Sequence, residues 1–158
     1  ETADSELAVL TGDGPPSLTG LGGPPPMVAA GNVVLIGHRT AGLDQASAAE
    51  LARLPAGLLA VDAPAVLRDP HEAGARAATR TSLPMWLHID VDVLDAAVMP
   101  AVTYPQPGGP DLDQLATVLA PLAAAENLLG VSIADFRPDL DPDGRYAARL
   151  VELLDRTL

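Results

Sequence analysis

The sequence predicts an α/β fold: a parallel sheet with helices on both faces, in three α/β/α layers. Four short runs rich in Val, Ile and Leu are almost continuously apolar, which is typical of strands that are buried on both faces. Segments with helical periodicity follow these runs, and such alternation favours parallel pairing. The 158 residues are 48% hydrophobic, which is enough for the core of one domain. We therefore expect residues 1–158 to form a single α/β domain.

The first third of the chain has the least regular pattern. A short helix is expected over residues 6–10. Residues 12–26 then read GDGPPSLTGLGGPPP, and this density of Pro and Gly excludes a helix or a central strand. We expect a surface loop there, with a loop beside a binding cleft as the alternative.

Strands and helices alternate in the rest of the chain. The expected strands are 32–38, 58–62, 84–90 and 128–133. The expected helices are 46–54, 65–79, 111–125 and 144–158. Asp44 or Ser47 can cap the first helix, and Pro70 must kink or split the second. Asp111 can cap the third helix. The residues expected to face the core from the last helix are Ala147, Ala148, Val151 and Leu154, and Trp86 is expected in the core as well.

Composition excludes several classes of function. The formal net charge of -12 argues against a nucleic-acid partner, which needs a basic surface, and against an anionic membrane. The chain has no Cys, and therefore no disulfide framework, thiolate zinc site or cysteine nucleophile. Its start lacks the basic and apolar regions of a signal peptide, and it does not begin with Met. We expect a cytoplasmic protein whose translation starts before residue 1.

Two carboxylates end the third predicted strand, where α/β sheets place their chemistry. Asp90 and Asp92 are two residues apart, so in an extended chain they point to the same side. Their charges repel one another, and a proton, an Arg or a metal cation must compensate. Carboxylate oxygens suit Mg²⁺, Ca²⁺ or Mn²⁺. In the alternative interpretation, Asp90 only ends the strand and Asp92 is solvated in a loop.

Other polar residues lie near the ends of predicted elements. Arg39 follows the first strand and is expected to form a structural ion pair with Asp62, with a substrate carboxylate as the alternative partner. Arg137 is close to Asp135 in sequence and can neutralise it. Asp141 precedes the last helix, and we expect it to cap that helix because the segment lacks a full calcium ligand set.

Residues 88–109, HIDVDVLDAAVMPAVTYPQPGG, resemble the last signature of the arginase/agmatinase (ureohydrolase) family. That signature is Asp-x-Asp-x-x-Asp-Pro, followed by a Pro-containing loop that ends in Pro-x-Gly-Gly. Residues 33–39 resemble the Ile-Gly-x-Arg strand of the family, and residues 130–142 resemble its next strand. Residues 1–14 are similar to the stretch after the central metal motif of the family. The resemblance covers nearly the whole chain.

The resemblance implies a hydrolase that releases urea, or a related amide, from a small guanidino or formimino compound. Ureohydrolases bind two Mn ions, whose bridging hydroxide attacks the guanidinium carbon. The family pattern makes Asp90 and Asp92 metal ligands, and Asp95 a brace for the loop. Asp135 matches the acidic residue that contacts the substrate guanidinium, where Glu is usual, and is the catalytic candidate. His88 is expected as a second-shell partner of the metal site, with a core histidine as the alternative.

The chain departs from the family pattern at several points. The other four metal ligands come from Gly-Gly-Asp-His and Asp-Ala-His-x-Asp motifs, and neither motif occurs in the 158 residues. Thr40 stands where the family often has Asp, which argues against amino-acid recognition of the arginase kind. Ala96 stands where Pro is usual. We therefore expect the carboxyl-terminal half of a larger arginase-like domain, with a sheet incomplete at its amino-terminal side, or else a degenerate relative.

Three hypotheses for the function follow. The first is a manganese-dependent hydrolase of linear amidines, active in a full-length form that assembles as a homo-oligomer. The second is a non-catalytic, degenerate arginase-like subunit or interaction module without a complete metal site. The third is a binding module for a single divalent ion through Asp90 and Asp92. The partner expected for the enzyme is a small guanidino-type substrate, with no nucleic acid and no membrane.

Overall fold

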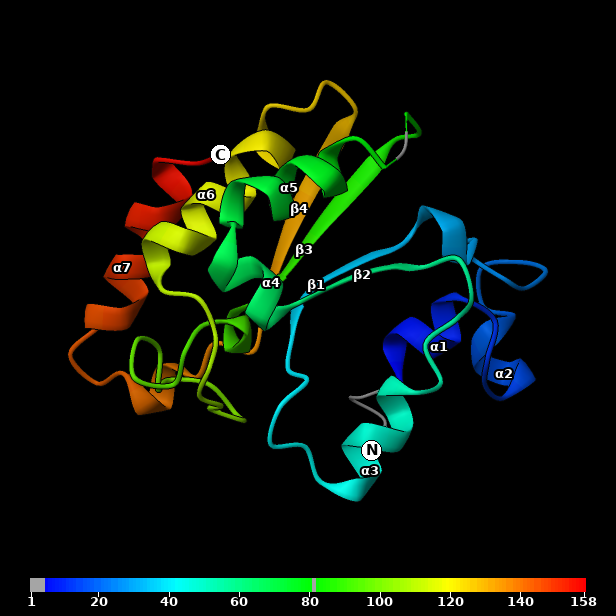
Figure 1. Cartoon of the computed structure of the whole chain (residues 1–158), viewed down its shortest axis with the longest axis horizontal. Coiled ribbons are helices and arrows are strands. Elements are labelled where there is room, and N and C mark those ends of the chain that lie inside the picture. Colours follow the sequence, from blue (N-terminus) through cyan, green and yellow to red (C-terminus); the bar gives the residue numbers. More distant parts are fainter. Residues whose placement is uncertain (1–4, 81) are drawn as a thin grey trace. The chain divides into compact units, whose positions relative to one another are not determined.

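The computed structural model describes residues 5–80 and 82–158 (Figure 1). Residues 1–4, the start of the first stretch that resembles the family, lie outside the described residues. The chain divides into two compact units. The first contains the chain up to Leu35 and Gly42–Ala60, and the second contains Ile36–Ala41 and Val61–Leu158. The single domain over residues 1–158 stays a prediction.

The first unit holds the irregular part of the chain. Its helices are α1 (Glu6–Leu10), α2 (Pro16–Thr19), the 3₁₀ turn η2 (Ala30–Asn32) and α3 (Gln45–Leu51). Asp44 caps α3 as expected, and its carboxylate accepts from the Ser47 amide at 2.8 Å. The segment 12–26 contains the short helix α2, which was not predicted. It begins at Pro16, because the fixed φ of proline suits the first position of a helix.

The second unit holds a parallel strand pair and four α-helices. Its strands are β3 (Met85–Asp90) and β4 (Leu128–Ala134), and its helices are α4 (Ala63–Arg68), α5 (Pro70–Ala78), α6 (Leu112–Ala123) and α7 (Arg145–Asp155). Pro70 splits the predicted helix 65–79 into α4 and α5, and Asp69 caps the second part. Asp111 begins α6 with a full capping box. The α/β class with parallel pairing is confirmed.

The strands form two sheets, although the alternation predicted one sheet of four. β1 (Val34–His38) pairs with β2 (Leu59–Asp62), and β3 pairs with β4. Gly37 near the end of β1 has a φ of 85°, which lies outside extended backbone and interrupts a regular strand edge. The prediction of one continuous sheet is therefore wrong for the described residues.

The core of the second unit lies between β3, α6 and α7. Its buried members are Ile89, Val91, Leu94, Met99, Ala101, Val102, Leu115, Leu119 and Leu153. Figure 1 shows α5, α6 and α7 on one side of the β3–β4 pair. The prediction for Trp86 is wrong, since its side chain is 63% exposed. Leu87 packs against the core, and Trp86 has the opposite parity in the strand, so it points away.

The buried face of α7 also differs from the prediction. Val151 is 65% exposed and Ala148 is exposed, so neither faces the core. Leu153 is the buried residue, and the helix packs Tyr146, Leu150 and Leu154 beside it. This stripe has the helical period and includes Leu154, as predicted, but it is rotated away from Ala148 and Val151.

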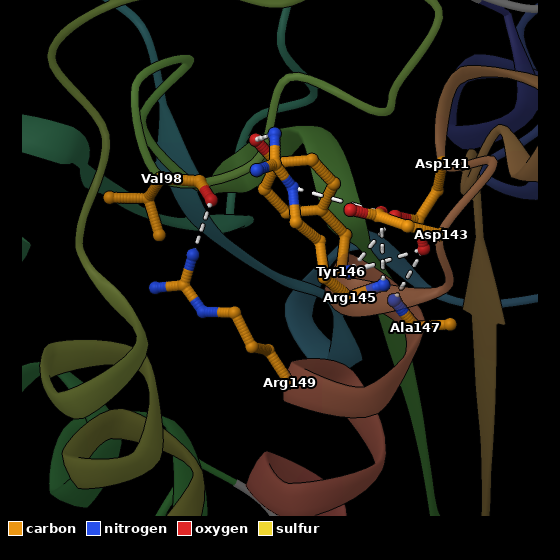
Figure 2. Close-up of polar contacts among 7 residues, drawn as sticks. All are labelled: Val98, Asp141, Asp143, Arg145, Tyr146, Ala147 and Arg149. Carbon is orange, nitrogen blue, oxygen red and sulfur yellow. Dashed lines mark hydrogen bonds and ion pairs between the residues drawn. The ribbon is translucent and has the colours of Figure 1, made fainter.

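Asp141 anchors the start of α7, as Figure 2 shows. It is a buried acidic residue, 6% exposed. Its carboxylate accepts from the amide of Ala147 at 2.9 Å and from the amide of Tyr146 at 3.1 Å. It therefore satisfies N–H groups that the first turn of a helix leaves without backbone partners. The capping hydrogen bonds expected of Asp141 are therefore present, although Gly144 holds the N-cap position itself.

None of the helices in the described ranges 5–80 and 82–158 is long and apolar enough to cross a membrane.

We predict that Asp141→Ala lowers the melting temperature by about 3–6 °C, because the first turn of α7 loses the acceptor for its amides. Asp143→Ala is the matched control. Asp143 is exposed and is the weaker acceptor of this turn, since its carboxylate lies 3.4 Å from the Arg145 amide and 3.9 Å from the Arg145 guanidinium. The control should change the melting temperature by less than about 1 °C. Scanning calorimetry compares the two, and equal losses would contradict the capping role.

Candidate functional site

Three carboxylates meet at the carboxyl edge of the β3–β4 pair. Asp90 ends β3, Asp92 lies in the 3₁₀ turn η3 (Val91–Val93) that follows, and Asp135 comes directly after β4. Each offers a carboxylate oxygen, and these oxygens lie within 4.8 Å of one another. Parallel pairing explains the meeting, because Asp90 is in register with Ala134, the residue before Asp135.

Backbone hydrogen bonds fix two of these carboxylates. Oδ1 of Asp90 accepts from the amide of Asp92 at 3.1 Å, which turns the chain out of the strand. Oδ2 of Asp135 accepts from the amide of Thr103 at 3.0 Å. Asp135 has a φ of 63°, a left-handed conformation that Asp tolerates better than most residues. The end of β4 is thereby tied to the long loop between β3 and α6.

The electrostatics of this cluster favour a cation. The pKa of Asp92 is raised from 3.8 to about 7. Burial is the largest cause, followed by the charge of Asp90 and a hydrogen bond with it, and Asp135 adds repulsion. Arg39 lowers the pKa of Asp92, but it does not offset the other contributions. A divalent ion would relieve the repulsion, and an all-carboxylate donor set suits Mn²⁺ or Mg²⁺, so these residues fit the metal that the resemblance implies.

Asp95 braces the loop that precedes α6. Its Oδ1 accepts from the Ala97 amide at 2.9 Å, and its Oδ2 accepts from the Gly108 amide at 2.7 Å. These hydrogen bonds lower the pKa of Asp95. Asp95 is outside the cluster of three carboxylates. Its contacts agree with the bracing role that the family pattern suggested.

His88 contacts the neighbouring strand. Its Nδ1 lies 2.8 Å from Oγ of Ser132, and that hydroxyl accepts from Nε1 of Trp86 at 3.0 Å. The hydroxyl proton of Ser132 is then free to point at His88, which would leave the imidazole proton on Nε2. His88 shares the face of β3 with Asp90, but its role beside the metal site stays a prediction.

The structure places Arg39 and Arg137 differently from the sequence interpretation. Arg39 donates to backbone carbonyls of the loops around the site, whereas Asp62 accepts from the Ala65 amide and the Thr40 hydroxyl. Arg137 pairs with Asp139 at 2.6 Å, and its expected neutralisation of Asp135 gives way to this closer partner. The ion pair of Arg39 with Asp62 was therefore the wrong prediction.

Sequence reasoning missed the carbonyl contacts of Arg39 and the Thr103 amide. The residue types in a sequence do not reveal which backbone groups a distant side chain will contact. Gly109 gave one available signal, because a Cβ at that position would overlap the guanidinium of Arg39 and the carbonyl of Val93. The Pro-x-Gly-Gly sequence therefore ends in a glycine that lets another group approach the backbone closely.

Comparison with known proteins identifies the family and the fold of the chain. A model of the arginase family matches residues 25–157. The formimidoylglutamase of Aeromonas hydrophila is 41% identical over 73 residues, which are 44% of this chain and 23% of that protein. Arginase from Bacillus subtilis superposes with a TM-score of 0.81 at 26% identity, over 96% of this chain and 53% of that one. A formiminoglutamase from Trypanosoma cruzi, solved with manganese, shares the fold at a TM-score of 0.68 and 17% identity, over 82% of this chain and 44% of that one.

The fold thus defines an arginase-like α/β chain. Because the family match covers most of its residues, the chain belongs to the arginase family. The resemblance carried by residues 88–109 is confirmed. The aligned part is about a quarter of the A. hydrophila protein and about half of the B. subtilis arginase.

The raised pKa of Asp92 gives a prediction for stability. The folded chain binds this proton more tightly than the unfolded chain, so the stabilisation is complete below 3.8 and is lost as the pH rises through about 7. Above that pH the ionised carboxylate is destabilising. Asp92→Asn should therefore make the metal-free chain more stable at pH 8, by about 1 kcal/mol once solvent screening of this half-exposed group is included.

Urea unfolding at pH 8 and pH 5, with a chelator present, measures this effect. The advantage of Asp92→Asn should shrink at pH 5, because folded Asp92 is then protonated in the unmodified chain as well. Asp139→Asn is the control, since its hydrogen bond with Arg137 lowers the pKa of Asp139 instead. An equal gain from Asp92→Asn at both pH values would contradict the electrostatic explanation.

Proposed function

We propose that this chain supplies the carboxylate side of a binuclear manganese site in a hydrolase of linear amidines. The observation that carries the proposal is the meeting of Asp90, Asp92 and Asp135 within 4.8 Å in a chain of the arginase family. Asp90 and Asp92 would hold the metal, and their hard oxygen atoms suit Mn²⁺. When bound, the metal supplies Lewis-acid activation of a water molecule.

Asp135 is proposed to orient the substrate. The Thr103 amide occupies its Oδ2, so its Oδ1 is the oxygen available to accept N–H groups from a cationic amidinium or guanidinium. The side chain is one methylene shorter than the Glu usual in the family. We infer that a substrate held by Asp135 lies closer to the strand edge than one held by Glu would.

The curated relative and the structural neighbours support a linear amidine as the substrate class. The A. hydrophila protein is a formimidoylglutamase, and the B. subtilis neighbour is an arginase. Thr40 follows Arg39 where the family often has Asp, so recognition of a free amino-acid end in the arginase manner is disfavoured. We therefore propose a small formimino or guanidino compound. Assembly as a homo-oligomer, cytoplasmic location and the lack of nucleic-acid and membrane partners stay predictions.

A non-catalytic role is the second candidate. Of the metal-ligating motifs of the family, only the Asp-x-Asp occurs in the 158 residues. Two carboxylates cannot complete the shells of two ions, so the binuclear site needs ligands from elsewhere, whereas Asp90 and Asp92 with water can hold a single ion. A degenerate subunit that lacks those ligands would keep the fold and bind at most one ion weakly.

Asp90→Asn should weaken Mn²⁺ binding by at least about tenfold, because a neutral amide replaces a charged ligand of the same shape. Metal content after equilibrium dialysis against Mn²⁺, determined by elemental analysis, measures the loss. Asp139→Asn removes an acidic charge that is ion-paired outside the cluster, and it should leave metal content unchanged. Unchanged metal content in Asp90→Asn would reject this ligand assignment.

The 158-residue chain alone should not release urea from arginine or agmatine, nor a related amide from a formimino compound, across a Mn²⁺ titration. Nothing in the sequence fixes the second ion beside the first, so the spacing that two-metal activation needs is lost. The assay is product release by chain of verified intact mass. Saturable turnover that a chelator abolishes would show that residues such as His38 or His88 complete the site.

A further inference from the structure

We infer that Arg39 is a positioning residue, whose guanidinium clamps the backbone that carries Asp92 against the loop before α6. The clamp rests on contacts within the second unit alone. Its effect on metal binding rests, in addition, on the proposed function. The experiment below separates the two.

The guanidinium donates to three segments of the chain. Nη1 donates at 2.9 Å to the carbonyl of Gly37, which lies in β1 two residues before Arg39. Nη1 and Nη2 reach the turn after β3, and the acceptors there are the carbonyls of Val93 at 3.1 Å, Leu94 at 3.1 Å and Asp92 at 3.4 Å. Nε and Nη2 reach the loop before α6, at the carbonyls of Pro107 (3.1 Å) and Gln106 (3.3 Å). All three nitrogens are used.

The chemistry of these contacts suits arginine in particular. A short 3₁₀ turn such as η3 leaves its last carbonyls without helical partners. A planar guanidinium presents five N–H groups in a fixed fork and stays charged, so it can satisfy several carbonyls in one plane. Burial lowers the pKa of Arg39, whereas the charges of Asp92 and Asp95 raise it. A lysine has one nitrogen and cannot reach all three segments.

Two glycines allow this close approach. A side chain at Gly109 would overlap Nη2 of Arg39 and the carbonyl of Val93. A side chain at Gly37 would meet the side chain of Val93, and Gly37 also has a φ of 85°. The close packing of β1, the turn after β3 and the loop before α6 around the guanidinium therefore requires glycine at positions 37 and 109.

The clamp acts on Asp92 through its peptide groups. The amide of Asp92 donates to Asp90, and its carbonyl accepts from Arg39. The peptide groups on both sides of the Cα are thus held, which fixes the direction in which the Asp92 side chain leaves the backbone. The next turn is held as well, because the Asp95 amide donates to the Pro110 carbonyl at 3.0 Å. Groups that orient a ligand from outside the metal shell change metal affinity by about 10- to 100-fold.

The test compares Arg39→Met and Arg39→Lys with the control Arg53→Met. Arg53 belongs to the first unit and forms one exposed ion pair with Asp13. Hydrogen exchange reads the amides of Leu94, Asp95 and Gly108, and electron paramagnetic resonance reads free Mn²⁺ in a titration. Arg39→Met should lower protection of these three amides and weaken Mn²⁺ binding by about 10- to 100-fold. Arg53→Met should change neither.

Two further variants keep the test decisive if Arg39→Met fails to fold. Gly109→Ala keeps the arginine, but a Cβ there would overlap Nη2 of Arg39 together with the Val93 carbonyl and the Asp95 amide. It should therefore reproduce both effects, and the cycle below separates the part that acts through Arg39. Arg39→Lys keeps the charge without the fork, so its affinity should lie nearer to that of Arg39→Met than to the unmodified chain. A double-mutant cycle compares Gly109→Ala in two backgrounds. The substitution should weaken Mn²⁺ binding less in the Arg39→Met variant than in the unmodified chain.

The outcomes separate the two claims. Full Mn²⁺ affinity in Arg39→Lys would overturn the inference, since charge alone would then suffice. Unchanged exchange in both Arg39→Met and Gly109→Ala would overturn it as well. If the unmodified chain binds no Mn²⁺, the proposed function and the metal role of Arg39 both fail, whereas lost amide protection in the variants would still support the clamp.

Discussion

The parallel pairing of β3 with β4 is the constraint on which the site depends. It places Asp90 in register with Ala134, and so brings Asp135 to the edge where Asp92 turns away from the strand. Asp92 and Asp135 thereby become neighbours, although they are more than 40 positions apart in the chain. The core beneath, with Ile89 against α6 and α7, holds that register because a slip of one residue would turn apolar side chains to solvent.

The same edge concentrates negative charge, and the surroundings partly compensate for it. Asp92 is half-buried beside two other carboxylates, and its raised pKa reflects that burial and repulsion. Asp95 lies in the same loop but accepts two backbone amides, and its pKa is lowered. Backbone donors thus stabilise one carboxylate and leave the other short of positive charge. This difference favours a cation beside Asp92, whereas the hydrogen bonds of Asp95 stabilise the loop before α6.

Periodicity and turn chemistry predicted most of the second unit. The break at Pro70 and the cap at Asp111 follow from rules that a few neighbouring residues obey. The errors concern which face a side chain takes and which distant backbone groups it meets. Trp86 was placed in the core by its size, although its parity opposes that of the buried Ile89. The contacts of Arg39 could not be predicted, because backbone carbonyls are present at every residue.

The central claim is that the meeting point of Asp90, Asp92 and Asp135 is a metal site. The most direct test is anomalous diffraction at the manganese edge from crystals of the chain grown with Mn²⁺, with Asp90→Asn crystals alongside. We expect an anomalous peak between the carboxylates of Asp90 and Asp92 that is lost in the variant. A peak elsewhere, or none at saturating Mn²⁺, would contradict it.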